Sequence, residues 1–274
     1  GKKSNIVIYI LLVILAVIFL APIFIILFNS FKGKLYISDA PFKLPTAETF
    51  VGVQNYIDGL SKTGFLSAFG WSIFITFFST IVIVLFTSMT GWYITRAKNK
   101  VSTVLYFIFV FSMIVPFQMV MFTMSKVANM LSLDNPIGLI VLYLGFGAGL
   151  SIFMFSGFVK SIPIDIEEAA LIDGCNPIKT FFLIVLPLLK PICITVAILN
   201  VMWIWNDYLL PSLVLKSDYK TIPMAVQYLR GGYGAIDMGA MMAVLVLAII
   251  PIIIFYLTCQ KYIIEGVAAG AVKG

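Results

Sequence analysis

A short acidic stretch carries the chemically most distinctive side chains of this sequence. Asp165, Glu167, Glu168 and Asp173 lie within nine residues of a chain that is 61% hydrophobic and only 11% charged. Carboxylates this close together could share acid/base work, or they could meet basic groups on another protein. The chain contains no histidine, which excludes His-based catalytic triads and His-ligated metals. Its three cysteines lie at unrelated spacings and indicate neither a disulfide framework nor a zinc motif.

Six apolar runs surround this stretch, and each is long enough to cross a bilayer as a helix. The mean hydropathy is +1.08, and the apolar residues are continuous rather than alternating, which favours helices over a β-barrel. The sequence therefore predicts an all-α integral membrane protein with six transmembrane helices in a single domain, residues 1–274. The first run is too long for the core of a signal peptide and lacks a small-residue cleavage site, so we expect it to be retained. The runs are Ile6–Phe28, Phe69–Ile94, Val101–Phe122, Ile137–Phe158, Leu183–Leu210 and Met238–Thr258.

Basic residues in the short loops predict the orientation of the spans. Lys2 and Lys3 precede the first run, and a basic turn, residues 96–100, follows the second. By the positive-inside rule both termini lie in the cytoplasm, together with the loop 159–187 that contains the acidic stretch. The net charge of +6 comes from such span ends, and no basic cluster indicates binding to nucleic acid.

Local signals in this loop predict a short helix followed by a sharp turn. Asp165 with Glu168 three residues later is typical of a capping box, and both carboxylates would favour the positive end of the helix dipole. Gly174 suits the left-handed residue that ends a helix. Asn176 and Pro177 are then typical of the N-cap and first residue of a second helix. We therefore expect the chain to re-enter the membrane through an elbow.

The expected helix has a small apolar face formed by Ile166, Ala169, Ala170 and Ile172. Alanine leaves little bulk, so a groove on another protein could approach the helix backbone closely. Carboxylates on the rest of the helix would keep it soluble when unbound. The alternative is a solvated interhelical loop whose charges only mark the cytoplasmic face.

The spacing of the stretch resembles the EAA signature of permease subunits in ATP-binding-cassette (ABC) importers. Glu168, Ala169 and Ala170 are followed after three residues by Gly174, and after nine more residues by the run Ile184–Pro187. Every defining position of the signature is matched. The resemblance implies a MetI-like permease fold with the signature between the fourth and fifth spans.

Nearly the whole chain takes part in this resemblance. Trp205–Leu215, Gln260–Gly274 and the loop motif 42–50 are similar to the carbohydrate-uptake branch, and most of all to the second permease of maltose-type importers. Cys175 stands where the family more often has Ala, and the pair 178–179 departs from a commoner polar pair. Neither departure touches a defining residue.

The resemblance also implies roles for individual residues. The helix would seat in a cleft of a cytoplasmic ATPase subunit, with Glu168 orienting or anchoring it and the two alanines in close contact. Gly174 would form the elbow, and Pro187 would be the rigid restart of the fifth span. The implied ATPase-coupling set is Glu168, Ala169, Ala170, Asp173, Gly174, Ile184, Leu186 and Pro187.

The implied partners are a second homologous permease, two cytoplasmic ATPase subunits and an extracytoplasmic solute-binding protein, in the lipid of a bacterial plasma (inner) membrane. The binding protein would meet the two external segments, Asn29–Ala68 and Pro211–Asp237, of which the first has the turn signals of a folded loop. Sugar or oligosaccharide as the substrate follows from the resemblance alone. Lys261–Gly274 is placed to touch the ATPases as well.

The sequence shows no nucleotide-binding motif that could make this chain an ATPase. The stretch Gly59–Gly64 imitates a phosphate-binding loop, but Phe65 and Leu66 follow where Lys and Ser/Thr are required. The glycines of 145–149 lie inside an expected span, where close helix packing explains them better than a nucleotide fingerprint. We therefore expect a non-catalytic subunit without a cofactor, with ATP and Mg²⁺ bound by the partner ATPase.

Polar and aromatic residues at the outer end of the fifth run are candidates for contact with the substrate. They are Trp203, Asn206, Asp207 and Tyr208, of which Trp203 and Asp207 share a helix face. An indole could stack on a sugar ring while Asn206 or Asp207 accepts hydrogen bonds from hydroxyl groups. The alternative is an interfacial aromatic belt whose polar residues meet water.

Three other classes of membrane protein fit the sequence less well. A secondary transporter is the nearest alternative, but it predicts ionisable residues near the middle of the membrane, and the spans are almost free of charge. An intramembrane protease would need paired membrane aspartates or a Ser/His pair. A passive channel would leave the docking helix without a purpose.

Overall fold

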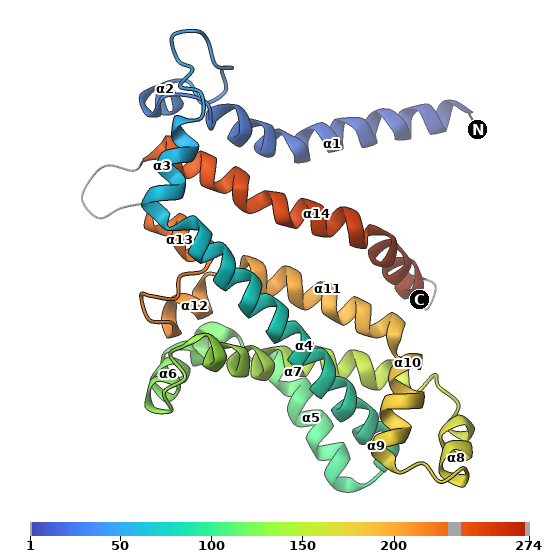
Figure 1. Cartoon of the computed structure of the whole chain (residues 1–274). Coiled ribbons are helices and arrows are strands. Elements are labelled where there is room, and N and C mark those ends of the chain that lie inside the picture. The colour runs from blue at the N-terminus through green and yellow to red at the C-terminus, as the bar shows by residue number, and fades with distance from the viewer. Residues whose placement is uncertain (1, 230–236, 272–274) are drawn as a thin grey trace. The chain divides into compact units, whose positions relative to one another are not determined.

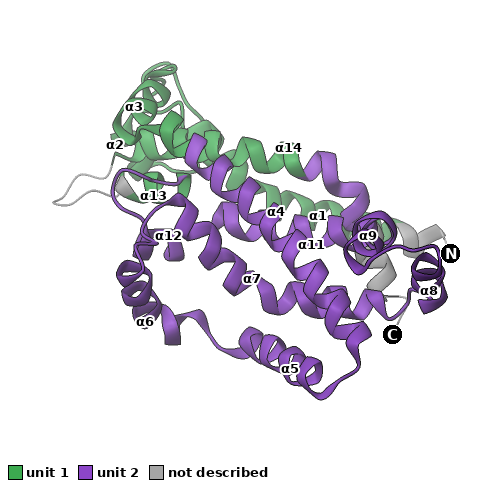
Figure 2. Cartoon of the chain, turned by 60° about the horizontal axis from the view of Figure 1, so that its bottom comes forward, with its two compact units in different colours: residues 1–69, 222–255 green, residues 70–221, 256–274 purple. Residues whose placement is uncertain are grey.

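Helices form every named element in the residues that the computed structural model describes, 2–229 and 237–271 (Figure 1). In the same residues an isolated antiparallel bridge pairs Lys32 with Phe50. The chain divides into two compact units, which comprise residues 1–69 with 222–255 and residues 70–221 with 256–274 (Figure 2). The prediction of an all-α protein is confirmed.

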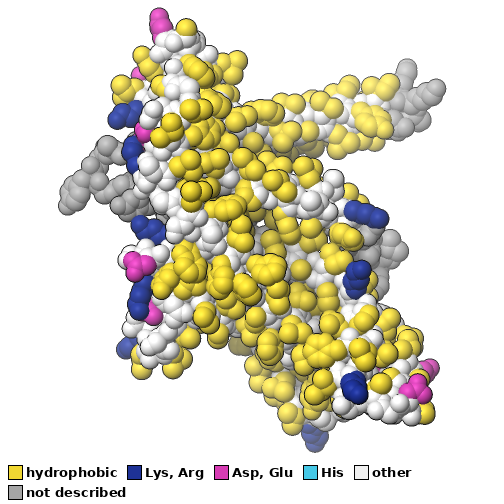
Figure 3. Space-filling view, in the orientation of Figure 1, with side chains coloured by type: hydrophobic (Ala, Val, Ile, Leu, Met, Phe, Trp, Pro, Cys, Tyr) yellow, Lys and Arg dark blue, Asp and Glu magenta, His cyan; other side chains and the backbone are white. Residues whose placement is uncertain are grey.

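The first unit begins with α1 (Lys2–Asn29), an apolar helix whose candidate span has a hydropathy of 3.4. The hydrophobic side chains from Ile6 to Leu20 are exposed, and Figure 3 shows apolar side chains along the face of this helix that is in view. A helix that is hydrophobic all round belongs in lipid or against other apolar helices. The unit also contains α2 (Lys34–Asp39), α3 (Gln54–Thr63), α13 (Ile222–Tyr228) and the beginnings of α4 (Phe65–Ala97) and α14 (Met238–Ala271).

The segment Asn29–Ala68 is a folded loop, as its turn signals predicted. Lys32 is buried, and its Nζ donates hydrogen bonds to Asn29 Oδ1 at 2.9 Å and to the backbone oxygens of Ala40 at 2.7 Å and Lys43 at 3.0 Å. Burial lowers the pKa of this lysine. Since an ammonium group has three donors, these bonds satisfy it completely and fix the loop around it.

The second unit contains most of α4 and every helix from α5 to α12. Asn99 Oδ1 accepts the Ser102 N–H at 2.8 Å, and Asn135 Oδ1 accepts the Gly138 N–H at 3.0 Å, so asparagine side chains start α5 and α7. Helix α7 packs against both α5 and α11. The helices are α5 (Lys100–Ile114), α6 (Phe117–Met130), α7 (Pro136–Val159), α8 (Ile164–Ile172), α9 (Pro177–Thr180), a π-helix η1 (Phe181–Val185), α10 (Leu186–Leu188), α11 (Lys190–Asn206) and α12 (Leu209–Val214).

Four of the six predicted spans form single long helices, namely α1, α4, α7 and α14. The other two are bent. The third run breaks between α5 and α6 by 106°, and the fifth breaks between α10 and α11 by 77°. The predicted spans Val101–Phe122 and Leu183–Leu210 therefore each contain a bend, and six spans are reached if each bent pair counts as one.

Proline explains both breaks. Val115 takes an extended conformation before Pro116, as the residue before a proline prefers, and this ends α5. Leu189 lies between Pro187 and Pro191, and neither proline can donate the backbone hydrogen bond that a continuous helix needs. By contrast, α1 and α14 continue through Pro22 and Pro251.

An ion pair holds the start of α14 in the first unit. Asp237 Oδ1 accepts the Ala240 N–H at 3.1 Å, and Oδ2 accepts a hydrogen bond from Lys62 Nζ at 2.5 Å. Partial burial by itself would raise the pKa of Asp237, but the bond from Lys62, the Ala240 N–H bond and the charges of Lys62 and Lys34 together outweigh it, and the pKa lies below the ordinary 3.8. The same bond raises the pKa of Lys62 above 10.5. The pair therefore stabilises the unit at pH values between the ordinary pKa of Asp, 3.8, and that of Lys, 10.5. This contribution to stability is lost as the pH falls through the lowered pKa of Asp237 or rises through the raised pKa of Lys62.

Replacing Lys62 with methionine should raise the pKa of Asp237 above its value in the unsubstituted protein. Without Lys62, burial is opposed only by the Ala240 N–H bond and weaker charges, so the carboxyl should titrate at a higher pH. The variant should be slightly less stable near neutral pH and should lack the acid-side loss of stability that the pair contributes in the unsubstituted protein. The change in stability should be small because Lys62 is half exposed. The pH dependence of thermal unfolding measures it. Asp58→Asn is the control, since Asp58 lies 3.7 Å from Lys62 and leaves the Asp237 bond intact; equal acid limbs for Lys62→Met and the unsubstituted protein would contradict the prediction.

Candidate functional site

Helix α8 follows α7 and precedes α9 in the chain, lies to the outside of α9 (Figure 1), and ends in the predicted elbow. Gly174 has φ +84°, the left-handed conformation, and nothing lies near the position of a Cβ. Asn176 Oδ1 accepts the Lys179 N–H at 2.8 Å, and Pro177 follows it, so the predicted start of the second helix is confirmed. The short helix and sharp turn of the sequence analysis are therefore present.

The predicted capping box at the start of α8 is wrong. Pro163 is the N-cap, and no side chain caps the helix. Because the chain becomes helical from Ile164 onward, Asp165 already lies in the first turn, where its carboxylate still favours the positive end of the dipole.

The structure divides the predicted apolar face of α8. Ile166, Ala169 and Ile172 are exposed, and Ile172 retains 87% of its accessible surface. Ala170 is only 7% exposed because it lies against the body of the unit. The exposed acidic side chains of α8 are Asp165, Glu168 and the following Asp173, and Figure 3 shows carboxylates gathered on this helix.

Glu167, in contrast, is buried, and both of its oxygens are engaged. Arg96 donates from Nε at 2.9 Å and from Nη2 at 2.7 Å to Oε1, and Trp92 donates from Nε1 at 2.9 Å to Oε2. Both partners lie in the last turns of α4. Sequence reasoning counted the basic turn only as a topology signal, although Trp92 and Arg96 are four residues apart and therefore share a helix face.

The segment after the elbow anchors the loop in an apolar core. Phe181, Val185 and Leu189 are fully buried against Phe155 and Val159 of α7. Of the predicted coupling residues in this segment, Ile184 and Leu186 are half-buried and Pro187 is exposed. Pro187 lies in the three-residue α10, so the long straight part of the fifth span begins three residues later, at Lys190.

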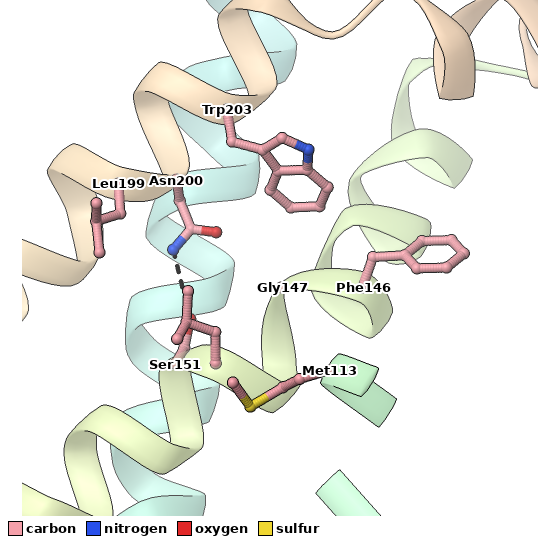
Figure 4. Close-up of a pocket in the computed structure, with 8 residues that line it drawn as sticks. Met113, Phe146, Gly147, Ser151, Leu199, Asn200 and Trp203 are labelled. Carbon is pink, nitrogen blue, oxygen red and sulfur yellow. Dashed lines mark hydrogen bonds between the residues drawn. The ribbon is translucent and has the colours of Figure 1, made fainter. Parts of the chain in front are cut away.

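A cavity of about 310 Å³ lies between α5, α7 and α11 of the second unit (Figure 4). Its wall is mostly apolar, and its polar side chains come from Asn200 and Ser151, which are joined by a hydrogen bond of 3.4 Å. Trp203 extends toward it from α11. The lining residues are Met113, Phe146, Gly147, Leu150, Ser151, Leu199, Asn200 and Trp203.

The predicted substrate residues have different environments. Trp203 lines the cavity, and its ring packs edge-on against Tyr143, with 5.3 Å between centroids. Asp207 Oδ2 accepts a hydrogen bond from the Tyr143 hydroxyl at 3.0 Å, and its Oδ1 accepts the Leu209 N–H at 3.0 Å. Asn206 and Tyr208 are partly or fully exposed outside the cavity lining. Asn200 and Ser151 escaped the sequence analysis, although polar side chains within an apolar span are a usable signal.

In the described residues, no three His, Cys, Asp or Glu side chains come together in a way that could hold a metal ion. The acidic residues of α8 project separately, and Glu167 is already paired. The site is therefore an exposed acidic helix on a fixed base, with a separate small cavity in the same unit.

Residues 84–268 match the family described as the inner membrane component of binding-protein-dependent transport systems. The chain belongs to this family. It is therefore a membrane permease subunit of a transport system, as the resemblance implied, and its part in transport is not that of an enzyme.

Relatives of this permease have names from carbohydrate transport. The chain is 39% identical over 262 residues, 95% of its length and 94% of the relative's, to the "Probable starch degradation products transport system permease protein AmyC" of Thermoanaerobacterium thermosulfurigenes. It is 35% identical to the "Multiple sugar-binding transport system permease protein MsmG" of Streptococcus mutans, covering 97% and 96% of the two chains. A solved bacterial ABC transporter involved in the import of alginate has the same fold, with a TM-score of 0.81, 24% identity and coverage of 95% and 96%.

Replacing Gly174 with alanine should destabilise the elbow of the permease. A Cβ in the left-handed conformation costs roughly 1–2 kcal/mol, and since no atom lies near the site the cost is purely conformational. Gly157→Ala is the matched control, because this exposed glycine in α7 also has open space but ordinary helical geometry; it should be neutral or add about 0.5–1 kcal/mol. Thermal unfolding in detergent measures both. Equal effects of the two substitutions would contradict a left-handed elbow.

Proposed function

We propose that the permease is a transmembrane subunit of an ATP-driven importer of sugar or oligosaccharide, which receives its substrate from a binding protein. The single observation that carries the coupling part is α8, an exposed short helix that bears the EAA signature and stands on a buried base. The names of the relatives support carbohydrate as the class of substrate.

The exposed face of α8 is the surface that meets a cytoplasmic ATPase. Ala169 offers close approach, Ile172 offers an apolar contact, and Glu168 with Asp173 offers charge for basic groups on the partner. Ala170 and Glu167 act from behind this face by holding the helix to the permease. Gly174, Ile184, Leu186 and Pro187 form the connection to the fifth span.

The proposed topology has six spans in one domain, residues 1–274, with both bent pairs counted as spans and both termini in the cytoplasm. The positive-inside distribution supports this orientation. The continuation of α14 to Ala271 supports a helical C-terminal segment on the side of the ATPases. The chain lies in a bacterial plasma (inner) membrane.

Partners complete the transporter. A second homologous permease pairs with this chain, two ATPase subunits bind ATP and Mg²⁺, and an extracytoplasmic binding protein delivers the sugar to the external segments 29–68 and 211–237. Residues 230–236 of the second segment lie outside the described residues. The folded loop around Lys32 supports a surface that is ordered before the binding protein arrives.

The cavity between α5, α7 and α11 is the part of the substrate pathway that this subunit contributes. A mostly apolar wall with few polar groups is typical of small-molecule sites, and an indole presents a flat face to a sugar ring. Trp203 supplies the aromatic contact, while Asp207 and Tyr143 fix the edge of the cavity. Asn206 and Tyr208 lie outside the residues that line the cavity.

Uptake driven by ATP tests the function. The assembled complex, in vesicles with the binding protein, should import labelled oligosaccharides such as starch degradation products or raffinose only with ATP, and vanadate should stop it. Ala169→Trp should remove the close approach and abolish both uptake and copurification of the ATPase. Leu171→Trp, an equally exposed change on the opposite side of α8, should retain both. Uptake driven by an ion gradient without ATP would instead establish a secondary transporter.

Substitution of Trp203 tests whether the cavity belongs to the substrate pathway. Trp203→Ala should lower uptake between about twofold and tenfold, the range expected for losing one aromatic contact. Asn206→Ala is the control, because Asn206 Nδ2 already bonds to Met202 O at 2.7 Å on the exposed side of α11. Unchanged uptake by a Trp203→Ala complex that assembles normally would remove the cavity from the substrate pathway.

A further inference from the structure

Glu167 differs from the other carboxylates of α8 in both burial and bonding. Its side chain is 8% exposed and that of its partner Arg96 is 17% exposed. Three N–H groups share its two oxygens, two from Arg96 and one from Trp92. A charge-assisted bond with two donors from one guanidinium fixes direction as well as distance, so α8 cannot rotate or slide without breaking it.

Arg96 and Trp92 of α4 also hold both ends of the loop that contains α8. Arg96 Nη2 donates to the backbone oxygen of Ile162, just before α8, at 2.9 Å. The Trp92 ring packs on Phe181, just after the elbow, with 5.5 Å between centroids. The chain segment 162–181 is therefore fastened to α4 before, within and after the docking helix, and bending of the loop cannot absorb a movement of α8.

The inner end of α4 is in turn packed tightly on α7. Gly91, five residues before Arg96, lets α4 and α7 approach closely. A Cβ added at Gly91 would lie only 2.8 Å from Phe155 Cβ, so a larger residue would not fit there. Ser156 Oγ donates to the Gly91 oxygen at 3.4 Å. Displacement of the end of α4 therefore displaces α7, which also supplies Phe146, Gly147 and Ser151 to the cavity wall.

We propose that Arg96, Trp92 and Glu167 form the strut through which movement of α8 reaches the transmembrane helices. This inference rests on the proposed function, because it assigns the force to an ATPase that grips α8. Glu168 faces outward and belongs to the contact with the ATPase, whereas Glu167, one position earlier, faces inward and joins the helix to α4. Glu167 is a positioning residue: it touches neither nucleotide nor sugar, and it acts through α4.

If these residues form a strut, removing Glu167 should uncouple ATP hydrolysis from sugar import without preventing assembly of the complex. Glu167→Ala in the full complex should retain the ATPase subunits and their hydrolysis of ATP but import at least about tenfold less sugar per ATP hydrolysed, the factor that 1.4 kcal/mol of lost coupling corresponds to. Glu168→Ala, on the outer face of the same helix, should instead weaken copurification of the ATPase. A merely structural role of Glu167 would lower hydrolysis and import in proportion and would leave their ratio unchanged.

Two milder variants keep the test decisive if Glu167→Ala does not assemble. Trp92→Phe keeps the ring on Phe181 and removes only the N–H donor, and Glu167→Gln keeps the shape but removes the charge. Sugar imported per ATP should fall less in Trp92→Phe than in Glu167→Gln. An unchanged ratio in both variants overturns the strut while leaving the proposed function intact; absence of ATP-dependent uptake in the unsubstituted complex overturns the proposed function itself.

Discussion

A hydrocarbon layer offers no hydrogen-bond partners to a polypeptide, and this constraint governs the whole chain. Backbone N–H and C=O groups must be satisfied within the segment that crosses, so the apolar runs become helices. Where proline removes a donor, near Pro116 and between Pro187 and Pro191, the helix breaks and the chain bends. Such breaks need protection by neighbouring helices, and α7, packed against α5 and α11, lies beside both bent spans.

Charge is scarce in this permease, and its ion pairs lie near helix ends. Arg96 meets Glu167 at the end of α4, Lys62 meets Asp237 at the start of α14, and Lys216 meets Asp134 before α7. The exposed pairs contribute little to stability. The pair of Arg96 and Glu167 is different because Glu167 is buried within α8 and both of its oxygens accept hydrogen bonds. Breaking it would leave a buried charge without a partner, so it acts as a rigid joint.

Because Glu167 is paired with Arg96, the two sides of α8 differ. One side of the helix is committed to the permease through Glu167 and Ala170, and the other side, with Ala169 and Ile172, remains open. A docking helix that was free on all sides would transmit no force, and one that was buried on all sides would have no partner. The nine residues of α8 can meet both requirements because residues three apart share a side of a helix, which places Glu167 with Ala170 on the buried side and Ala169 with Ile172 on the exposed side.

The sequence by itself determined the elements whose cause is local. Continuous hydrophobicity marked the four long spans, Gly174 and Asn176 with Pro177 marked the elbow, and the EAA spacing marked the family, because each signal depends on residues near one another in the chain. It did not predict the bends, since Pro22 and Pro251 are tolerated in helices while Pro116 is not, and only packing distinguishes them. Tertiary structure alone decided which carboxylate of α8 turns inward, because that choice depends on Trp92 and Arg96, about seventy residues away. It also decided that Trp203 shares a cavity with Ser151 and Asn200, since α7 and α11 meet only when the chain is folded.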